Sequence, residues 1–261
     1  MQTEVIFGYP GTGKTTTLLN RLQDCVDKGY AYDEIKFISF NRKTRKSVTH
    51  KVLQQGVPEK SAKDMVRTIH SMCFNLLDLN KTEDVLTDKQ RDMFCSKFNI
   101  PCGETIDESG ASIANNLGDL FFNEYAYLRN KYFHKGSPHI KNKFPSIEGA
   151  NHDHLTRRKA IYLIEEYEKM KKDLGVLDYT DLLIKTYEQG LRPLIKVLLV
   201  DEFQDLTNLH YAIYKNWVSG CDFVYIAGDD CQTIYDQFGA NHILLLKEAK
   251  KRLEAHRSPF L

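Results

Sequence analysis

The sequence predicts an α/β protein whose core is a doubly wound parallel sheet, with an α-helical subdomain inserted into it. Three observations predict this fold class: short apolar runs alternate with helical patterns, a glycine-rich loop follows the first run, and a long helical stretch interrupts the alternation. With 261 residues, 42% of them hydrophobic, the chain is long enough for one large domain with an insertion.

Short runs of apolar and β-branched residues, bounded by turn or polar residues, have the pattern of strands buried on both faces. Five runs fit this pattern: Val5–Phe7, Lys36–Phe40, Val66–Ile69, Val197–Val200 and Phe223–Ala227. Helical patterns follow three of them, at Lys14–Lys28, Thr44–Gln55 and Asn208–Val218. The alternation predicts a parallel sheet with helices on both faces.

The strand pattern stops between Phe74 and about Gly175, where the sequence becomes helical, charged and aromatic, with a Gly-, Pro- and Lys-rich break around Lys135 to Pro145. A long helix is expected at Thr156–Lys172. We therefore divide the chain into a discontinuous core, residues 1–74 and 175–261, and an inserted helical subdomain, residues 75–174.

Residues 123–144 of this insertion interleave aromatic and basic side chains. The pattern fits a nucleic-acid face and a small aromatic core with lysines on its outside equally well. The side chains are Tyr125, Tyr127, Tyr132, Phe133, Arg129, Lys131, Lys135, Lys141 and Lys143.

Composition narrows the function only slightly. The net charge of +1 gives no global attraction to polyanions, so a local patch would have to hold any nucleic acid. No apolar run approaches the roughly 20 residues of a membrane helix and no secretory signal is visible, so we expect a cytoplasmic protein with no membrane partner. The six cysteines form no C-x-x-C pair, which predicts reduced, mostly buried thiols rather than a zinc site or a disulfide framework.

The glycine-rich loop, Gly8 to Thr15, fits the phosphate-loop pattern G-x-x-x-x-G-K-[ST] directly between a predicted strand and a predicted helix. Backbone N–H groups of such a loop surround the β-phosphate, Lys14 would reach the β- and γ-phosphate oxygens, and Thr15 would ligate Mg²⁺. The expected ligands are thus ATP and Mg²⁺. The candidate nucleotide-binding residues are Gly8, Pro10, Gly11, Thr12, Gly13, Lys14, Thr15 and Thr16.

An acidic pair follows the fourth predicted strand, where open α/β sheets bind their ligands. Asp201 would hold Mg²⁺, directly or through water, and Glu202 would be the general base that orients an attacking water. That chemistry favours hydrolysis. It disfavours a kinase, which transfers the phosphoryl group to a second substrate. For Asp205, helix capping and catalysis are both open.

The segment "VDEFQD", followed by "YIAGDDCQTIYDQFGA" at Tyr225–Ala240, resembles the second and third motifs of superfamily 1 helicases of the UvrD/Rep/PcrA type. These are motors with RecA-like domains that use ATP to translocate along single-stranded DNA. The resemblance implies that Gln204 and Gln232 bind the nucleotide, that Gln232 acts in catalysis with Lys14 and Glu202, and that Tyr235 stacks on a base.

Three further segments fit the same family: "FISFNRKTRKSV", "RTIHSMC" and "GVLDYTDLL". The first two resemble elements that face the DNA strand, and the third resembles the return from the inserted subdomain to the core. Without the resemblance, the basic run would be interpreted as a solvated helix face and the lone histidine as a structural one. The candidate DNA-binding residues are Ser39, Phe40, Asn41, Arg42, Thr68, His70, Ser71 and Tyr235.

The sequence departs from the family at three places. Only four residues precede the first strand, where the family carries an adenine-recognising glutamine, and Phe238 stands where the family has an arginine. The sequence also ends before the second RecA-like domain of the family. We therefore expect that domain in cis in a longer chain or in trans, and we expect this chain alone to bind Mg·ATP better than it hydrolyses it.

The expected partner is single-stranded DNA, including at a duplex junction. The alternative is a reduced, non-motor homologue in which nucleotide binding only switches the affinity for nucleic acid or a protein.

Overall fold

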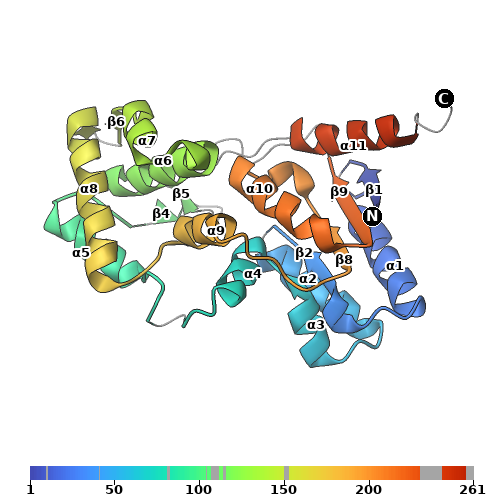
Figure 1. Ribbon diagram of the computed structural model, residues 1–261. Helices are drawn as coiled ribbons and strands as arrows, with labels where there is room; N and C mark the ends of the chain where they lie inside the picture. The colour runs from blue at the N-terminus through green and yellow to red at the C-terminus, as the bar shows by residue number, and fades with distance from the viewer. Residues whose placement is uncertain are drawn as a thin grey trace. The chain divides into compact units, whose positions relative to one another are not determined.

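The structure is a computed structural model that describes residues 1–9, 11–40, 42–80, 83–103, 105–106, 112–113, 116–149, 153–229 and 243–256. The chain divides into two compact units (Figure 1). Unit 1 comprises Met1–Leu77 and Lys185–Leu261, and unit 2 comprises Asp78–Ile184. The fold is α/β with a parallel central sheet, as predicted.

Unit 1 contains a five-stranded sheet in the order β1-β9-β8-β2-β3, in which every pair of neighbouring strands is parallel. All five predicted strands are present. Their bounds are β1 (Gln2–Phe7), β2 (Ile35–Ile38), β3 (Val66–Arg67), β8 (Val197–Val200) and β9 (Phe223–Gly228). Because the strands are parallel, their carboxyl ends meet at one edge of the sheet, and the predicted site residues follow these ends.

Helices cover the sheet of unit 1 (Figure 1). Leu18, Leu22, Val52 and Met65 join alternate residues of the central strands in one apolar core. The intervening strand residues, such as Leu198, are buried as well, so both faces of the sheet are covered. The helices are α1 (Lys14–Asp27), α2 (Arg42–Gln54), α3 (Glu59–Met65), α4 (Ile69–Leu76), α10 (Asn208–Trp217) and α11 (Ile243–His256), with 3-10 turns η1 (Tyr32–Glu34), η4 (Phe203–Asp205) and η5 (Val218–Gly220).

Unit 2 is mainly helical. Its helices are α5 (Asp88–Lys97), α6 (Leu117–Tyr132), α7 (Ser137–Lys143) and α8 (Arg157–Leu174), with the 3-10 turn η2 (Phe133–Lys135), and α9 (Tyr179–Glu188) crosses the boundary between the units. None of the helices in the described ranges is both long and apolar enough to cross a membrane.

Two expectations for the insertion are wrong. Strands do occur, as two short antiparallel ladders: β4 (Thr105–Ile106) with β5 (Ser112–Ile113), and β6 (Ile147–Glu148) with β7 (His154–Leu155). Two-residue strands leave no periodicity to detect. The predicted break also contains α7, because the proline lies in the first turn of that helix, where a missing N–H removes no hydrogen bond.

The aromatic residues of α6 form a core. Tyr125 is buried in a cluster with Phe121, Phe144 and Tyr167, and Tyr127 and Tyr132 pack against this cluster. This burial favours the interpretation of residues 123–144 as a small core over a nucleic-acid face.

A buried ionic network completes this core. Arg129 is 5% exposed and Lys171 is 3% exposed. The Arg129 guanidinium contacts the Asp178 carboxylate at 2.8 Å and also pairs with Asp181. Lys171 Nζ lies 2.9 Å from Asp178 Oδ2 and 2.6 Å from Asp181 Oδ2. These cations hold the pKa of Asp178 below its usual range against the opposing effect of burial.

The cysteine expectation is wrong for one pair. Cys95 and Cys102 form a disulfide, whereas Cys25, Cys73 and Cys221 are free and buried, as predicted. After α5 the chain turns back at Asn99, which has a φ of 51°, and the Ile100 N–H donates to the Cys95 carbonyl. This local reversal brings the two cysteines together, and a search for C-x-x-C pairs misses it.

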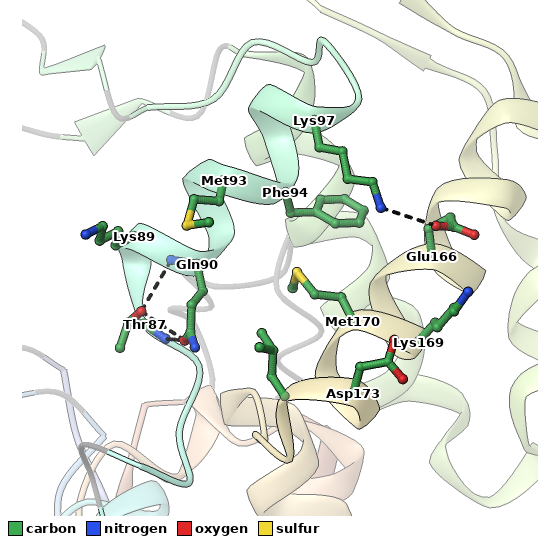
Figure 2. A pocket seen from close by; sticks show the side chains of 11 residues that line it. Thr87, Lys89, Gln90, Met93, Phe94, Lys97, Glu166, Lys169, Met170 and Asp173 are labelled. Atoms are coloured by element: carbon green, nitrogen blue, oxygen red, sulfur yellow. Dashed lines mark hydrogen bonds and ion pairs between the residues drawn. The ribbon is translucent and has the colours of Figure 1, made fainter.

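Helices α5 and α8 also line a hollow of about 790 Å³ in unit 2 (Figure 2). Met93, Phe94 and Met170 contribute its apolar surface, and Lys97 and Glu166 form an ion pair of 3.8 Å at its edge. It contains none of the predicted site residues.

Removing the Arg129 guanidinium should destabilise the protein strongly. Arg129→Ala leaves buried carboxylates short of one cation and is expected to lower the free energy of unfolding by about 3 kcal/mol. Urea denaturation followed by far-ultraviolet circular dichroism measures this change. The control is Lys63→Ala, which breaks an exposed ion pair with Glu59 and should change stability by less than about 1 kcal/mol. Equal changes in the two variants would contradict the structural role of the network.

Candidate functional site

The phosphate loop leaves β1 at the carboxyl edge of the sheet. The Gly8 N–H donates to the Gly228 carbonyl at 3.3 Å, which ties the start of the loop to the end of β9. Gly11 and Gly13 adopt the left-handed conformation, with φ of 79° and 85°, which favours glycine. A Cβ on Gly8 would lie 2.3 Å from Thr12 Oγ1. The backbone conformation thus favours glycine at positions 11 and 13, and the Thr12 side chain leaves little room for a Cβ at position 8.

Lys14 is the first residue of α1 and its side chain turns back into the loop. Its Nζ donates to the Gly8 carbonyl at 2.6 Å and to the Tyr9 carbonyl at 3.3 Å, and the residue is only 9% exposed. Thr12 Oγ1 donates to the same Tyr9 carbonyl at 2.7 Å. A buried ammonium and the N-terminus of α1 thus lie together, an arrangement that suits an anion.

A hydrogen bond joins the loop to the acidic end of β8. Thr15 Oγ1 donates to Asp201 Oδ2 at 2.7 Å across 186 residues of sequence, and the Glu202 N–H donates to Asp201 Oδ1 at 3.1 Å. Asp201 is 1% exposed. Burial raises the pKa of Asp201, and the hydrogen bond from Thr15 opposes this rise.

Gln204 connects the ends of β8 and β9. Its Nε2 donates to Glu202 Oε2 at 2.8 Å, and its Oε1 accepts the Asp229 N–H at 3.0 Å. Glu202 has a left-handed backbone conformation, with a φ of 51°, which is unusual for a residue with a side chain. Gln204 therefore fixes the orientation of the predicted base.

Asp205 does not cap the following helix. Thr207 is the N-cap of α10 and accepts the His210 N–H at 3.2 Å. Asp205 is 6% exposed, and its Oδ1 has no hydrogen-bond partner among the described residues. Burial, followed by the nearby charge of Glu202, raises the pKa of Asp205 to about 7. The structure thus rules out capping of α10 for this residue.

The predicted strand-facing residues follow β2 and β3. Ser39 is fully buried and its N–H donates to the Arg67 carbonyl at 3.0 Å. Thr68 caps α4 by accepting the Ser71 N–H at 3.2 Å, and Ser71 Oγ accepts from Arg67 at 3.3 Å. Thr68 and Ser71 thus have structural contacts in addition to the role expected of them.

A cavity of about 160 Å³ adjoins these residues and the metal-ligand candidate. Ser39, Phe40, His70 and Asp201 line it together with His210. The rings of His70 and His210 meet edge to face at 5.4 Å, and those of Phe40 and His210 at 6.2 Å. Desolvation lowers the pKa of His70 to about 4.

The structure brings Lys14, Thr15, Asp201, Glu202 and Gln204 together through the contacts above, whereas Thr16 is exposed on α1. Sequence reasoning missed His210, although the spacing from Thr207 is that of a capping box and placed it in the first turn of a helix. Five candidate residues have no described side chain: Pro10, Asn41, Arg42, Gln232 and Tyr235. Phe238 also lies outside the described residues.

The fold and the site define a P-loop α/β domain with the phosphate loop and an acidic strand end at one edge of the sheet. A protein-family model described as "UvrD/REP helicase N-terminal domain" matches residues 2–252. The chain belongs to this family, which confirms the resemblance found in the sequence motifs.

Several curated helicases are similar to most of the chain. A "Probable DNA helicase II homolog" of Mycoplasma genitalium is 26% identical over 247 residues, which cover 90% of this chain and 34% of that protein. "ATP-dependent DNA helicase Rep" of Buchnera aphidicola is 24% identical over 264 residues, which cover 94% of this chain and 38% of that protein. "DNA helicase II" of Escherichia coli is 33% identical over 85 residues, which cover 29% of this chain and 12% of that protein. The chain spans 32% to 45% of the length of the relatives that match most of it.

The raised pKa of Asp205 makes stability depend on pH. An unfolded aspartate ionises near pH 3.9, whereas the folded state keeps this proton until pH rises to about 7, so the folded state loses stability between these values. Asp205→Asn keeps the shape and removes the ionisation. We expect its gain in urea midpoint over the unaltered chain to be larger at pH 8 than at pH 5.

The matched control for this measurement is Asp33→Asn, at an exposed position, whose effect should be the same at both pH values. A pH-independent effect of Asp205→Asn would show that the carboxyl is already ionised at pH 5.

Proposed function

We propose that this chain is the ATP-binding core of a UvrD-like, ATP-dependent DNA helicase or translocase that couples ATP hydrolysis to movement on single-stranded DNA. The hydrogen bond between Thr15 and Asp201 carries the proposal, because it joins the phosphate loop to the acidic strand end in one site. In this proposal residues 1–74 and 175–261 form the RecA-like core, and residues 75–174 form the inserted subdomain. A cytoplasmic location is part of the proposal.

The loop residues bind the nucleotide. The ammonium of Lys14 and backbone N–H groups of the glycine-rich loop would bind the β- and γ-phosphates, and release of the Lys14 contacts to Gly8 and Tyr9 would free the ammonium for phosphate oxygens. In this arrangement Lys14 exchanges two carbonyl acceptors for charged ones, which form stronger hydrogen bonds.

Thr15 and Asp201 fit a magnesium ion. Their hydroxyl and carboxylate oxygens are 2.7 Å apart, and oxygen atoms are the ligands that Mg²⁺ prefers. No group of three or more His, Cys, Asp and Glu residues with metal-binding geometry occurs in the described ranges, which suits an ion held by one or two protein oxygens. When bound, Mg²⁺ would neutralise charge on the phosphates.

Glu202 orients and deprotonates the attacking water. The hydrogen bond from Gln204 occupies Oε2 of Glu202 and leaves Oε1 for the water, and the Gln204 contact to Asp229 holds this geometry against the end of β9. A positioned general base contributes roughly 10²- to 10⁴-fold to a rate. Gln232 would complete the site at the γ-phosphate.

Single-stranded DNA, including at a duplex junction, is the proposed partner. Ser39, Phe40, Asn41, Arg42, Thr68, His70, Ser71 and Tyr235 are the residues assigned to it. Cations near the end of β2 would attract phosphates, and the partly exposed Phe40 ring would stack on a base. The second RecA-like domain, in cis or in trans, would bind the nucleotide from its other side.

Nucleotide binding and turnover of this chain test the proposal. Lys14→Ala should lose affinity for Mg·ATP, because no other cation of the loop replaces the ammonium. Glu202→Gln keeps the side-chain shape, so ATP affinity should be unchanged while steady-state turnover, measured with and without a dT oligonucleotide, falls at least about 100-fold. Glu59→Gln, on an exposed face of α3, is the matched control and should leave both quantities unchanged.

Unchanged ATP affinity in Lys14→Ala would contradict nucleotide binding by this loop. Binding without turnover, together with a nucleotide-dependent affinity for the oligonucleotide, would instead favour the non-motor alternative.

A further inference from the structure

His210 belongs to neither set of residues assigned to ligands, yet it lies between them. It is 5% exposed and occupies the third position of α10, where its N–H donates to Thr207 Oγ1 and its Nδ1 lies 3.3 Å from the Thr207 backbone nitrogen. Because a backbone N–H can only donate, Nδ1 must be the acceptor and carries no proton. The capping box therefore selects the tautomer in which Nε2 carries the proton.

The ring of His210 is held neutral, and its Nε2–H is available as a hydrogen-bond donor. Desolvation, with a smaller effect of His70, lowers the pKa of His210 well below its usual value. Its Nε2 is buried and has no hydrogen-bond partner among the described residues. Buried N–H donors are nearly always satisfied by protein or by ordered water.

The cavity beside this ring has the properties of a water site. It has a volume of about 160 Å³, whereas one water needs only about 15 Å³ of such space. Its polar lining combines Ser39, His70 and Asp201 with His210. A water there needs two to four polar partners, and four polar side chains line the cavity.

The residues that line the cavity come from both groups of candidates in unit 1, those assigned to the nucleotide and those assigned to the DNA strand. Asp201 follows β8 and is the proposed metal ligand, whereas Ser39, Phe40 and His70 are assigned to the DNA strand. Strands β2 and β8 are neighbours, and Ile38 lies opposite Val200. Ser39 and Asp201 are the residues that directly follow this pair. Water in the cavity would contact the nucleotide side and the strand side at the same time.

We infer that His210 is a positioning residue whose Nε2–H holds water between Asp201 and the Ser39–Phe40–His70 side, and that this water couples nucleotide binding to strand binding. The inference rests on the proposed function for its two ligands. Occupation of the Asp201 side by Mg·nucleotide changes the charge that the water faces, and the water transmits this change to His70 and Phe40, whose rings contact His210. An element that both ligands affect can carry coupling between their two sites.

Three variants separate the donor from the helix cap. His210→Leu removes both the Nε2–H and the capping interaction. His210→Gln keeps both, because a glutamine at this position completes a capping box and still has an N–H to donate. Thr207→Ala removes the N-cap oxygen and leaves the backbone N–H that orients the ring, so it reports the effect of lost helix stability alone.

The measurement is the affinity of the full chain for a dT oligonucleotide, with and without Mg²⁺ and a non-hydrolysable ATP analogue. The ratio of the two dissociation constants is the coupling factor, and such factors typically lie between about 5 and 150. We expect His210→Leu to bring this factor close to 1 with little change in the affinity for either ligand alone. His210→Gln should keep most of it, and Thr207→Ala should keep it despite a lower melting temperature.

A full coupling factor in His210→Leu, or an equal loss in Thr207→Ala, would overturn the inference. A second readout does not depend on the proposed function: ¹⁵N chemical shifts of labelled histidine should show the Nε2–H tautomer for His210 at pH 7. The Nδ1–H tautomer would overturn the inference even if both ligands bind. Failure of the unaltered chain to bind the nucleotide, with the expected tautomer present, would instead contradict the proposed function.

Discussion

The hydrogen bond from Thr15 to Asp201 is the interaction on which the rest of the site depends. It connects the first turn of α1 to the end of β8, two segments that are 186 residues apart. Burial of Asp201 makes this bond important, because a carboxylate that is 1% exposed must find partners inside the protein. Thr15 and the Glu202 N–H supply these partners, and the bond brings the oxygen atoms suited to a metal next to Lys14.

Two further acidic residues, Glu202 and Asp205, follow Asp201 and have different surroundings. Glu202 is held by Gln204, and Asp205 lies in an apolar setting beside Glu202 that favours its protonated form. The parallel sheet brings the site residues together, because β1, β8, β2 and β9 all end at one edge.

Sequence patterns predict the parts of this protein that repeat over many residues or that a motif specifies. The five parallel strands, the helix after the phosphate loop and the positions of Lys14, Thr15 and Asp201 follow from apolar runs and from glycine spacing. The two-residue ladders, the Cys95–Cys102 disulfide and the location of His210 depend on tertiary contacts that leave no periodic signal. Arg129 has the sequence context of a surface cation, and only the carboxylates of Asp178 and Asp181 explain its burial.

A double-mutant cycle on Thr15→Val and Asp201→Asn tests most directly whether loop and strand end form one site. The measured quantity is the affinity for Mg²⁺ with a non-hydrolysable ATP analogue in the two single variants and the double variant. If the two oxygens act on the same bound ion, removal of either one weakens binding and removal of the second adds little, which gives an interaction energy of at least about 1 kcal/mol. Additive losses would show that Thr15 and Asp201 act independently and would contradict a single site formed by the loop and the strand end.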